Sequence, residues 1–411
     1  MSAIQDLIDS RGLRAVFQPV VELDGGAIVG YEALVRGPAG SDLEFPGTLF
    51  EAARGAGRLV ELDRCSRATA IEVALDHGLP EPQSLFLNAE PETLALDVLT
   101  RNAGISDRAV ADLRPVVEVT ERALSERPAE LVHAVSELRE RGIGIALDDV
   151  GADPRSLAFM PLLRPDVIKL DMSVVQSPPT ADTYEVVTAV QAHAERTGAA
   201  VLAEGVETEE HLHQARSFGA TLAQGYFFGR PGELGSGDGE PTPGSLPRLL
   251  MPGTNAATTP LALIGEAGDL RTATFELMTA IGTTFERHAS RLGESGILLA
   301  CIPHATWMTD GNLIHWAELS SRLAFAGIMG PDMKREPAPG VRGAAIERSD
   351  PVARELSMVA LGPHFAAATA GRDLTGSGPL AERRFEFGVT YERSVAIAAA
   401  RCLIARIGRA A

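Results

Sequence analysis

Short apolar runs alternate with amphipathic stretches through the first 230 residues of the chain. The helix-like stretches are clearest at residues 128–141 and 180–197, where apolar positions recur with helical spacing. Strand–helix alternation predicts a mostly parallel sheet, and eight such units in about 230 residues match a (β/α)8 barrel. The eight runs are residues 15–23, 27–36, 84–90, 115–121, 142–149, 166–171, 200–206 and 223–228.

Six successive runs end in a polar residue, although a strand buried on both faces should not carry carboxylates. One such residue is an ordinary feature of a strand end, but six in succession indicate a site. Neighbouring members are separated by about one βα unit, so they return to the same end of a barrel, the carboxyl-terminal mouth where active sites lie. These residues are Asn88, Glu118, Asp148, Lys169, Glu204 and Gln224.

A ring of oxygen-bearing side chains at this mouth predicts a site for hard divalent cations. Unpaired carboxylates would repel one another, and oxygen ligands favour Mg²⁺, Mn²⁺ or Ca²⁺ over zinc. The adjacent Asp148 and Asp149 suit a carboxylate shared by two cations, an arrangement that recurs in phosphoester hydrolysis. Lys169 places a compact ammonium at the same point. Because the chain has only one other lysine, Lys334, a lysine here indicates that the site requires a compact cation. The alternative explanation is that lysine stands at this position by chance. The predicted ring comprises Glu32, Asn88, Glu118, Asp148, Asp149 and Glu204.

Composition changes sharply between residues 231 and 260, where Gly, Pro, Ser and Thr dominate. We therefore expect three parts: a barrel at residues 1–232, a linker at 233–260 and a smaller α/β domain at 261–411. In the last part the pattern predicts helices at residues 271–292, 312–327 and 395–407. Strands are expected at 296–302, 344–347 and 356–361.

The net charge of −18 argues against binding to a nucleic-acid polymer or an anionic membrane, since both need basic patches. No window approaches the 18 or so apolar residues of a membrane span, and the first residues do not resemble a signal peptide. The three cysteines lie far apart with no CxxC pair, which fits a reducing compartment. We expect a cytoplasmic protein.

Eight ordered segments resemble the EAL-type cyclic di-GMP phosphodiesterases, a family with a modified TIM (β/α)8 barrel. Tyr31-Glu32-Ala33-Leu34-Val35-Arg36 matches the family signature, and Phe17-Gln18-Pro19 matches its opening strand. The other matching segments are Leu87-Asn88, Glu118-Val119-Thr120-Glu121, Leu147-Asp148-Asp149, Ile168-Lys169-Leu170-Asp171, Ala203-Glu204-Gly205-Val206-Glu207, and Gln224-Gly225-Tyr226 with Gly229-Arg230-Pro231.

The resemblance implies hydrolysis of cyclic di-GMP to linear pGpG with two Mg²⁺ or Mn²⁺ ions. Lys169 would orient the water, and Glu204 would act as general base or belong to the metal shell. Glu121 would support the loop after Asp149. The implied metal ligands are Glu32, Asn88, Glu118, Asp148 and Asp149, with Glu207 a further candidate, and the implied substrate contacts are Gln18, Leu34, Arg36, Gln224 and Pro231. For Leu34 and Pro231, packing is the alternative role.

One departure concerns residues 150–156, Val-Gly-Ala-Asp-Pro-Arg-Ser, where the family usually has Phe-Gly-Thr-Gly-Tyr-Ser-Ser. Pro154 stiffens this loop and Asp153 adds a charge near the metals. The family links the loop to metal-site assembly and to dimer contact, so a homodimer is expected from the resemblance alone. The alternatives to a catalyst are a non-catalytic cyclic di-GMP receptor and a scaffold that ignores the nucleotide.

The second half resembles the DICT sensory domain, chiefly at residues 383–391 and 359–365. The resemblance implies a regulatory role with an unknown ligand or protein partner. Trp307, Trp316, His304, His315 and His364 all fall in this part, where packing explains them better than a ligand pocket does.

Overall fold

The computed structural model describes residues 3–79, 82–90, 92–94, 105–120, 128–234, 244, 246 and 259–408. The chain forms two compact units. The first consists of Met1–Ala123, Ala134–Asp153 and Arg164–Met251, and the second of Leu124–His133, Pro154–Leu163 and Pro252–Ala411. The predicted limits at residues 232 and 260 are not tested by this division, and most of the proposed linker lies outside the described residues.

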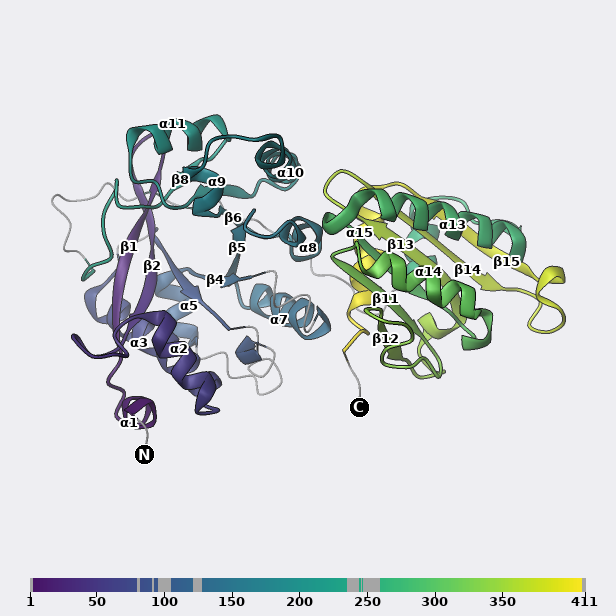
Figure 1. The fold of residues 1–411 in the computed structure, drawn as a ribbon, viewed down its shortest axis with the longest axis horizontal. Coiled ribbons are helices and arrows are strands. Elements are labelled where there is room, and N and C mark those ends of the chain that lie inside the picture. Colours follow the sequence, from purple (N-terminus) through teal and green to yellow (C-terminus); the bar gives the residue numbers. More distant parts are fainter. Residues whose placement is uncertain are drawn as a thin grey trace. The chain divides into compact units, whose positions relative to one another are not determined.

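The first unit is built on a closed barrel in which the strands follow one another in sequence order (Figure 1). The first strand is antiparallel to both of its neighbours, and the other pairs are parallel. This architecture confirms the predicted modified TIM barrel. The strands are β1 (Arg14–Glu22), β2 (Ile28–Arg36), β3 (Ser84–Asn88), β4 (Pro115–Val119), β5 (Gly144–Val150), β6 (Val167–Leu170), β7 (Ala200–Ala203) and β8 (Leu222–Ala223).

Helices connect the parallel strands, and their limits follow from capping residues. For example, the side chain of Thr180 accepts a hydrogen bond from Thr183 N at the start of α10, and Gly198 ends it with a φ of 77°. The helices in this part of the chain are α1 (Ala3–Asp9), α2 (Pro46–Gly55), α3 (Leu59–His77), α5 (Asp107–Leu113), α7 (Pro128–Glu140), α8 (Arg155–Leu163), α9 (Met172–Gln176), α10 (Ala181–Thr197) and α11 (Glu209–Ser217).

The C-terminal part of the second unit is a 7-stranded mixed sheet with helices on both faces, which confirms a second α/β region. The strand order is β12-β11-β10-β13-β14-β15-β9. Its elements are α12 (Pro260–Ala267), β9 (Arg271–Thr274), α13 (Phe275–Leu292), η1 (Gly293–Ser295), β10 (Ile297–Cys301), η2 (Ala305–Trp307), α14 (Asp310–Ser320), β11 (Phe325–Gly330), β12 (Arg342–Ala345), η3 (Pro351–Arg354), β13 (Glu355–Leu361), β14 (Ala366–Asp373), η4 (Leu380–Glu382), β15 (Arg384–Thr390) and α15 (Arg393–Ile404).

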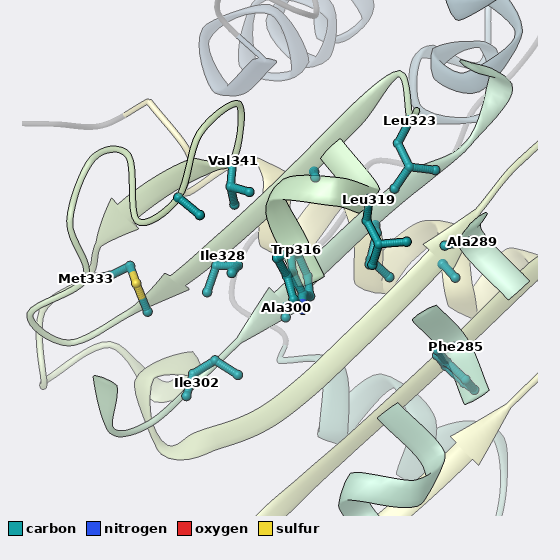
Figure 2. Close-up of a cluster of buried hydrophobic side chains, with 14 of the residues drawn as sticks. Phe285, Ala289, Ala300, Ile302, Trp316, Leu319, Leu323, Ile328, Met333 and Val341 are labelled. Carbon is teal, nitrogen blue, oxygen red and sulfur yellow. The ribbon is translucent and has the colours of Figure 1, made fainter. Parts of the chain in front are cut away.

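A buried hydrophobic cluster joins α13 and α14 to one face of this sheet (Figure 2). Phe285 of α13 and Trp316 of α14 pack with Leu298 and Ala300, alternate residues of β10 that share one face. Trp316 Nε1 also donates to Glu286 Oε1 at 2.8 Å, which satisfies the one polar atom of the indole. Both faces of β10 are buried, which explains its continuous apolar sequence.

Two sequence expectations for this part are wrong in detail. Residues 312–327 are not one helix, because α14 ends at Ser320 and β11 begins at Phe325. The run Phe325–Gly330 is apolar throughout and pairs in parallel with β10. Its pairing in the sheet therefore decides its structure, although the apolar pattern alone is compatible with a continued helix. Residues 271–274 form β9 at the edge of the sheet before α13 begins at Phe275.

Replacing Phe285 by alanine is expected to lower the free energy of unfolding by about 3–5 kcal/mol, since the side chain is 1% exposed and its loss leaves a cavity. Urea unfolding followed by tryptophan fluorescence measures this effect, because both tryptophans of the chain, Trp307 and Trp316, lie in the second unit. Ile314→Ala is the control, since Ile314 is 63% exposed on α14 and its loss should change stability by less than about 0.5 kcal/mol. Equal effects of the two substitutions would contradict the assigned core.

Candidate functional site: an acidic barrel mouth around Lys169

The polar residues at the strand ends face the barrel interior at one end. Residues two positions apart on a strand share a face, and the interior hydrophobic cluster contains the residues that precede these polar side chains by two. Phe86 precedes Asn88 in this way, and Val167 precedes Lys169. The same relation holds for Val116, Ala146, Leu202 and Leu222 with Glu118, Asp148, Glu204 and Gln224. The predicted return to one barrel end is therefore confirmed.

The first two strands bring Glu32 and Gln18 to the same mouth. Gln18 lies directly opposite Glu32 in the antiparallel β1–β2 pair, so both side chains project from the same face. On β1 the interior residue Val20 follows Gln18 because this strand runs in the opposite direction. Leu34 and Arg36 continue along the face of Glu32 and are half-buried.

The Lys169 ammonium lies among four carboxylates. Its Nζ atom is 2.8 Å from Glu118 Oε1, 2.8 Å from Asp148 Oδ1 and 2.9 Å from Glu204 Oε1. Glu32 Oε2 is 3.7 Å away. The side chains of Lys169 and Glu118 are each 1% exposed, whereas that of Glu204 is 19% exposed and is the most accessible of the four carboxylates.

Burial and mutual repulsion shift the protonation of these groups strongly. Burial raises the pKa of Glu118 well above its usual value, and the nearby Glu32 adds to this shift while Lys169 opposes it. Burial also raises the pKa of Glu204 to about 8, and Asp148 adds to this shift while Lys169 opposes it. Burial alone would lower the pKa of Lys169, but the surrounding carboxylates outweigh it and raise that pKa well above normal. The raised pKa values favour the protonated forms of Glu118 and Glu204, so the metal-free site relieves part of its repulsion by holding protons.

The two consecutive aspartates of β5 reach the same point because the strand is irregular there. Successive strand residues normally point to opposite faces. Here the pairing with β6 shifts register between Leu147 and Val150, and Asp149 adopts a positive φ of 54°. As a result, one oxygen each of Asp148, Asp149 and Glu204 lie within 4.8 Å of one another. Aspartate tolerates this left-handed conformation better than most residues.

Two amide groups hold the Glu32 carboxylate. Asn88 Nδ2 donates to Glu32 Oε1 at 2.9 Å, and Gln224 Nε2 donates to Glu32 Oε2 at 2.6 Å. Because Asn88 presents its nitrogen to Glu32, its oxygen is the atom left to ligate a cation. This arrangement suits the predicted role of Asn88 as a ligand.

The loop after β8 is tied back to the barrel, which brings its residues to the mouth. Phe17 of β1 exchanges hydrogen bonds with Gly232 at 2.7 and 3.1 Å, next to Pro231. Gly225 has a φ of 157°, and a Cβ atom there would lie 2.1 Å from Val206 O. Only glycine fits this close approach, which explains the glycine that follows Gln224 in the sequence.

Two predicted residues are not placed in this group. Glu207 is exposed on the loop after Glu204 and is absent from the set of converging carboxylates found among the described residues. Glu121 lies outside the described residues. Their predicted roles, like those of the other site residues, stay predictions.

Sequence analysis missed Asp63 of α3, which braces the segment after Asn88. Asp63 is 2% exposed, pairs with Arg67 one helical turn later and accepts a hydrogen bond from Glu90 N at 3.3 Å. An acidic and a basic residue four positions apart are usual on an exposed helix face. The signal that distinguishes this pair is its place among the buried residues of α3.

The donor set fits divalent cations. Glu118 Oε2 is buried and accepts no hydrogen bond from the described residues, although a buried carboxylate oxygen normally has a partner. Five carboxylates and one amide oxygen, without a histidine or cysteine, are the ligands of Mg²⁺, Mn²⁺ or Ca²⁺. The acidic cluster therefore offers a place for the cations that the sequence predicts.

This fold and site define a (β/α)8-type barrel with an acidic mouth, and comparison with known proteins identifies the family. Residues 1–231 match the family described as the EAL domain. The match covers more than half of the chain, so the protein belongs to the EAL-domain family.

Several relatives share this part of the chain. The cyclic di-GMP phosphodiesterase RocR of Pseudomonas aeruginosa is 31% identical over 232 residues, which cover 54% of this chain and 58% of RocR. The uncharacterized EAL-domain protein YkuI of Bacillus subtilis is 30% identical over 224 residues, covering 53% of this chain and 54% of YkuI. The chain thus spans little more than half the length of these two relatives.

A solved structure supports the barrel fold. The PaMucR phosphodiesterase in complex with c-di-GMP superposes with a TM-score of 0.50 at 24% identity, covering 56% of this chain and 96% of that one.

Within the described ranges, no helix combines the length and apolar character that a membrane crossing needs.

Replacing Lys169 by methionine is expected to destabilise the metal-free protein by about 3–5 kcal/mol, because it leaves buried carboxylates without their cation. Added Ca²⁺ should restore part of this loss by supplying positive charge to the same oxygens. Urea unfolding followed by circular dichroism, with and without Ca²⁺, measures both effects. Lys334→Met is the matched control, since the other lysine of the chain is exposed and should change neither value. A Lys169 variant as stable as the wild type would contradict the assigned charge balance.

Proposed function

We propose that this protein hydrolyses cyclic di-GMP to linear pGpG with two divalent cations, Mg²⁺ or Mn²⁺. The observation that carries the proposal is the convergence of Asp148, Asp149 and Glu204 beside a Lys169 ammonium already paired with four carboxylates. Membership of the EAL-domain family and the 31% identity with the phosphodiesterase RocR support the substrate.

The proposed ligands are Glu32, Asn88, Glu118, Asp148 and Asp149. Divalent cations bound there would lower the pKa of a water molecule and neutralise negative charge on the phosphodiester. Lys169 fixes the positions of three ligand carboxylates through its ion pairs and orients the water. The water oxygen bonds to phosphorus, the bond from phosphorus to the ribose 3′ oxygen breaks, and that oxygen takes up a proton from solvent to leave as a hydroxyl.

Glu204 is the proposed general base. Its side chain is the most exposed of the carboxylates around Lys169, so solvent reaches it most readily. One of its oxygens also lies within 4.8 Å of oxygens of Asp148 and Asp149, two of the proposed ligands. In this role Glu204 accepts the proton of the attacking water.

Residues on the β1, β2 and β8 side of the mouth are proposed to hold the dinucleotide. Gln18 lies opposite Glu32, while Leu34 and Arg36 extend along the same strand face towards the open end. Arg36 supplies a cation for a phosphate group. The bonds between Phe17 and Gly232 bring Pro231 alongside β1.

A regulatory role is proposed for the C-terminal α/β region. It has its own sheet and its own buried cluster, as a separate module does. The resemblance of residues 383–391 to DICT sensory domains supports a sensing function. Its ligand or protein partner is unidentified.

A non-catalytic cyclic di-GMP receptor is the second candidate, favoured by the altered loop at residues 150–156. Pro154 is one of the changed positions, and its ring fixes φ and stiffens the loop. Asp153 adds a carboxylate to a segment that begins next to Asp149. A receptor would bind the nucleotide without cleaving it.

The purified 411-residue chain incubated with cyclic di-GMP and Mn²⁺ is expected to release pGpG, detected by liquid chromatography. Glu32→Ala should lower kcat/KM at least about 100-fold, since it removes a ligand and loss of outer-shell partners alone costs 10–100-fold. Glu195→Ala is the control, because Glu195 is exposed in the last turn of α10, which leads into the start of β7 at the barrel end opposite the mouth. Nucleotide binding in Ca²⁺ without any pGpG in Mn²⁺ would favour the receptor. Full activity of Glu32→Ala would show that the site is misassigned.

A further inference from the structure

Three amide side chains and one carboxylate form a continuous chain of hydrogen bonds across the mouth. Gln18 Nε2 donates to Gly229 O at 3.1 Å, and Gln224 Nε2 donates to Gln18 Oε1 at 3.0 Å. The same Gln224 nitrogen donates to Glu32 Oε2 at 2.6 Å, and Asn88 Nδ2 donates to Glu32 Oε1 at 2.9 Å. The chain thus links the loop after β8 to β1, β2 and β3.

The direction of these bonds follows from their ends. A backbone carbonyl and a carboxylate accept hydrogen bonds, so Gln18 must present its nitrogen to Gly229 and its oxygen to Gln224. Gln224 must then present its nitrogen to both Gln18 and Glu32. An amide nitrogen carries two hydrogens, so both donors of Gln224 are committed within the protein.

Gln224 therefore has little to offer a ligand. The residue is 4% exposed, and its Oε1 atom is buried with no hydrogen-bond partner in the described part of the chain. A nucleotide would have to break the 2.6 Å bond to Glu32 in order to gain a donor from Gln224. This arrangement contrasts with the substrate contact that the family resemblance implies.

We propose that Gln224 is a positioning residue for the metal ligand Glu32. With one amide on each oxygen, the Glu32 carboxylate is fixed in rotation, and each oxygen keeps a lone pair for a cation. Groups that orient a ligand in this way typically contribute 10–100-fold to metal affinity. The inference rests on the metal centre of the proposed function. It names Gln224 as the residue that fixes the orientation of the Glu32 carboxylate before a cation binds.

The backbone around Gln224 is itself fixed by the strand that leads to Glu204. Gln224 N donates to Ala203 O at 2.9 Å, and Gln224 O accepts from Val206 N at 3.0 Å. The adjacent Gly225 packs so closely on Val206 that no Cβ atom fits there. Gln224 thus reaches Glu32 from a rigid base, as a positioning residue must.

The test is Gln224→Met, which keeps the length of the side chain and removes both donors. Isothermal titration of the metal-free chain with Mn²⁺, without nucleotide, should give a dissociation constant about 10–100-fold higher than that of the wild type. Unfolding in urea measures the stability of each variant.

Gln214→Met is the matched control. Gln214 of α11 also donates two hydrogen bonds through Nε2, a half-buried one to Val174 O at 3.2 Å and an exposed one to Ser177 O at 2.7 Å, and neither reaches a proposed metal ligand. Its loss should affect stability in the same range as Gln224→Met and leave the Mn²⁺ constant unchanged. Equal Mn²⁺ constants for Gln224→Met and Gln214→Met would overturn the proposal, since a merely structural role predicts that result.

Nucleotide binding separates this proposal from the substrate-contact alternative. If Gln224 contacts cyclic di-GMP, Gln224→Met weakens nucleotide binding in saturating Ca²⁺ and leaves the Mn²⁺ constant unchanged, which overturns positioning. Failure of the wild type to produce pGpG would refute the proposed reaction alone, because the Mn²⁺ titration does not depend on turnover. A wild type that binds no divalent cation would overturn both.

Discussion

The Lys169 ammonium is held by four carboxylates whose mutual repulsion would otherwise oppose closure of the barrel mouth. Folding brings these groups together because Lys169 and three of the carboxylates each follow an interior apolar residue by two positions, while the fourth, Glu32, lies opposite Gln18 at the same mouth. Burial weakens solvation of each charge, so the carboxylates retain protons or require cations. The Lys169 ammonium thus offsets part of the repulsion among these carboxylates and lets the mouth close around them.

The barrel and the set of residues at its mouth were predictable because both depend on the order of the apolar runs and on their regular spacing along the chain. Each apolar run has the length of a strand and ends in a polar residue one βα unit from the next. A regular succession of βα units is then enough to bring these polar residues to one end of the barrel. The closed sheet and the shared face of Glu118, Asp148 and Lys169 confirm this reasoning. Residues such as Glu207 show its limit, since a position in a motif says nothing about where an exposed side chain points.

Other features depend on local backbone or on distant partners, which the pattern of residues does not encode. The positive φ of Asp149 arises from a register shift in β5. The amide donors to Glu32 come from strands far apart in sequence. In the C-terminal sheet, β14 is rich in alanine and has Thr369 as its one β-branched residue, so its pairing with β13 and β15 decides its structure.

The backbone at residue 149 narrows the side chains that evolution can place there. Glycine would relax the left-handed turn but would remove an oxygen, and most other residues would strain it. Asparagine alone both tolerates the left-handed conformation and has the size of aspartate. A lineage drifting from catalysis towards sensing could therefore exchange one acid for its amide at this position, keep the fold, and lose only charge.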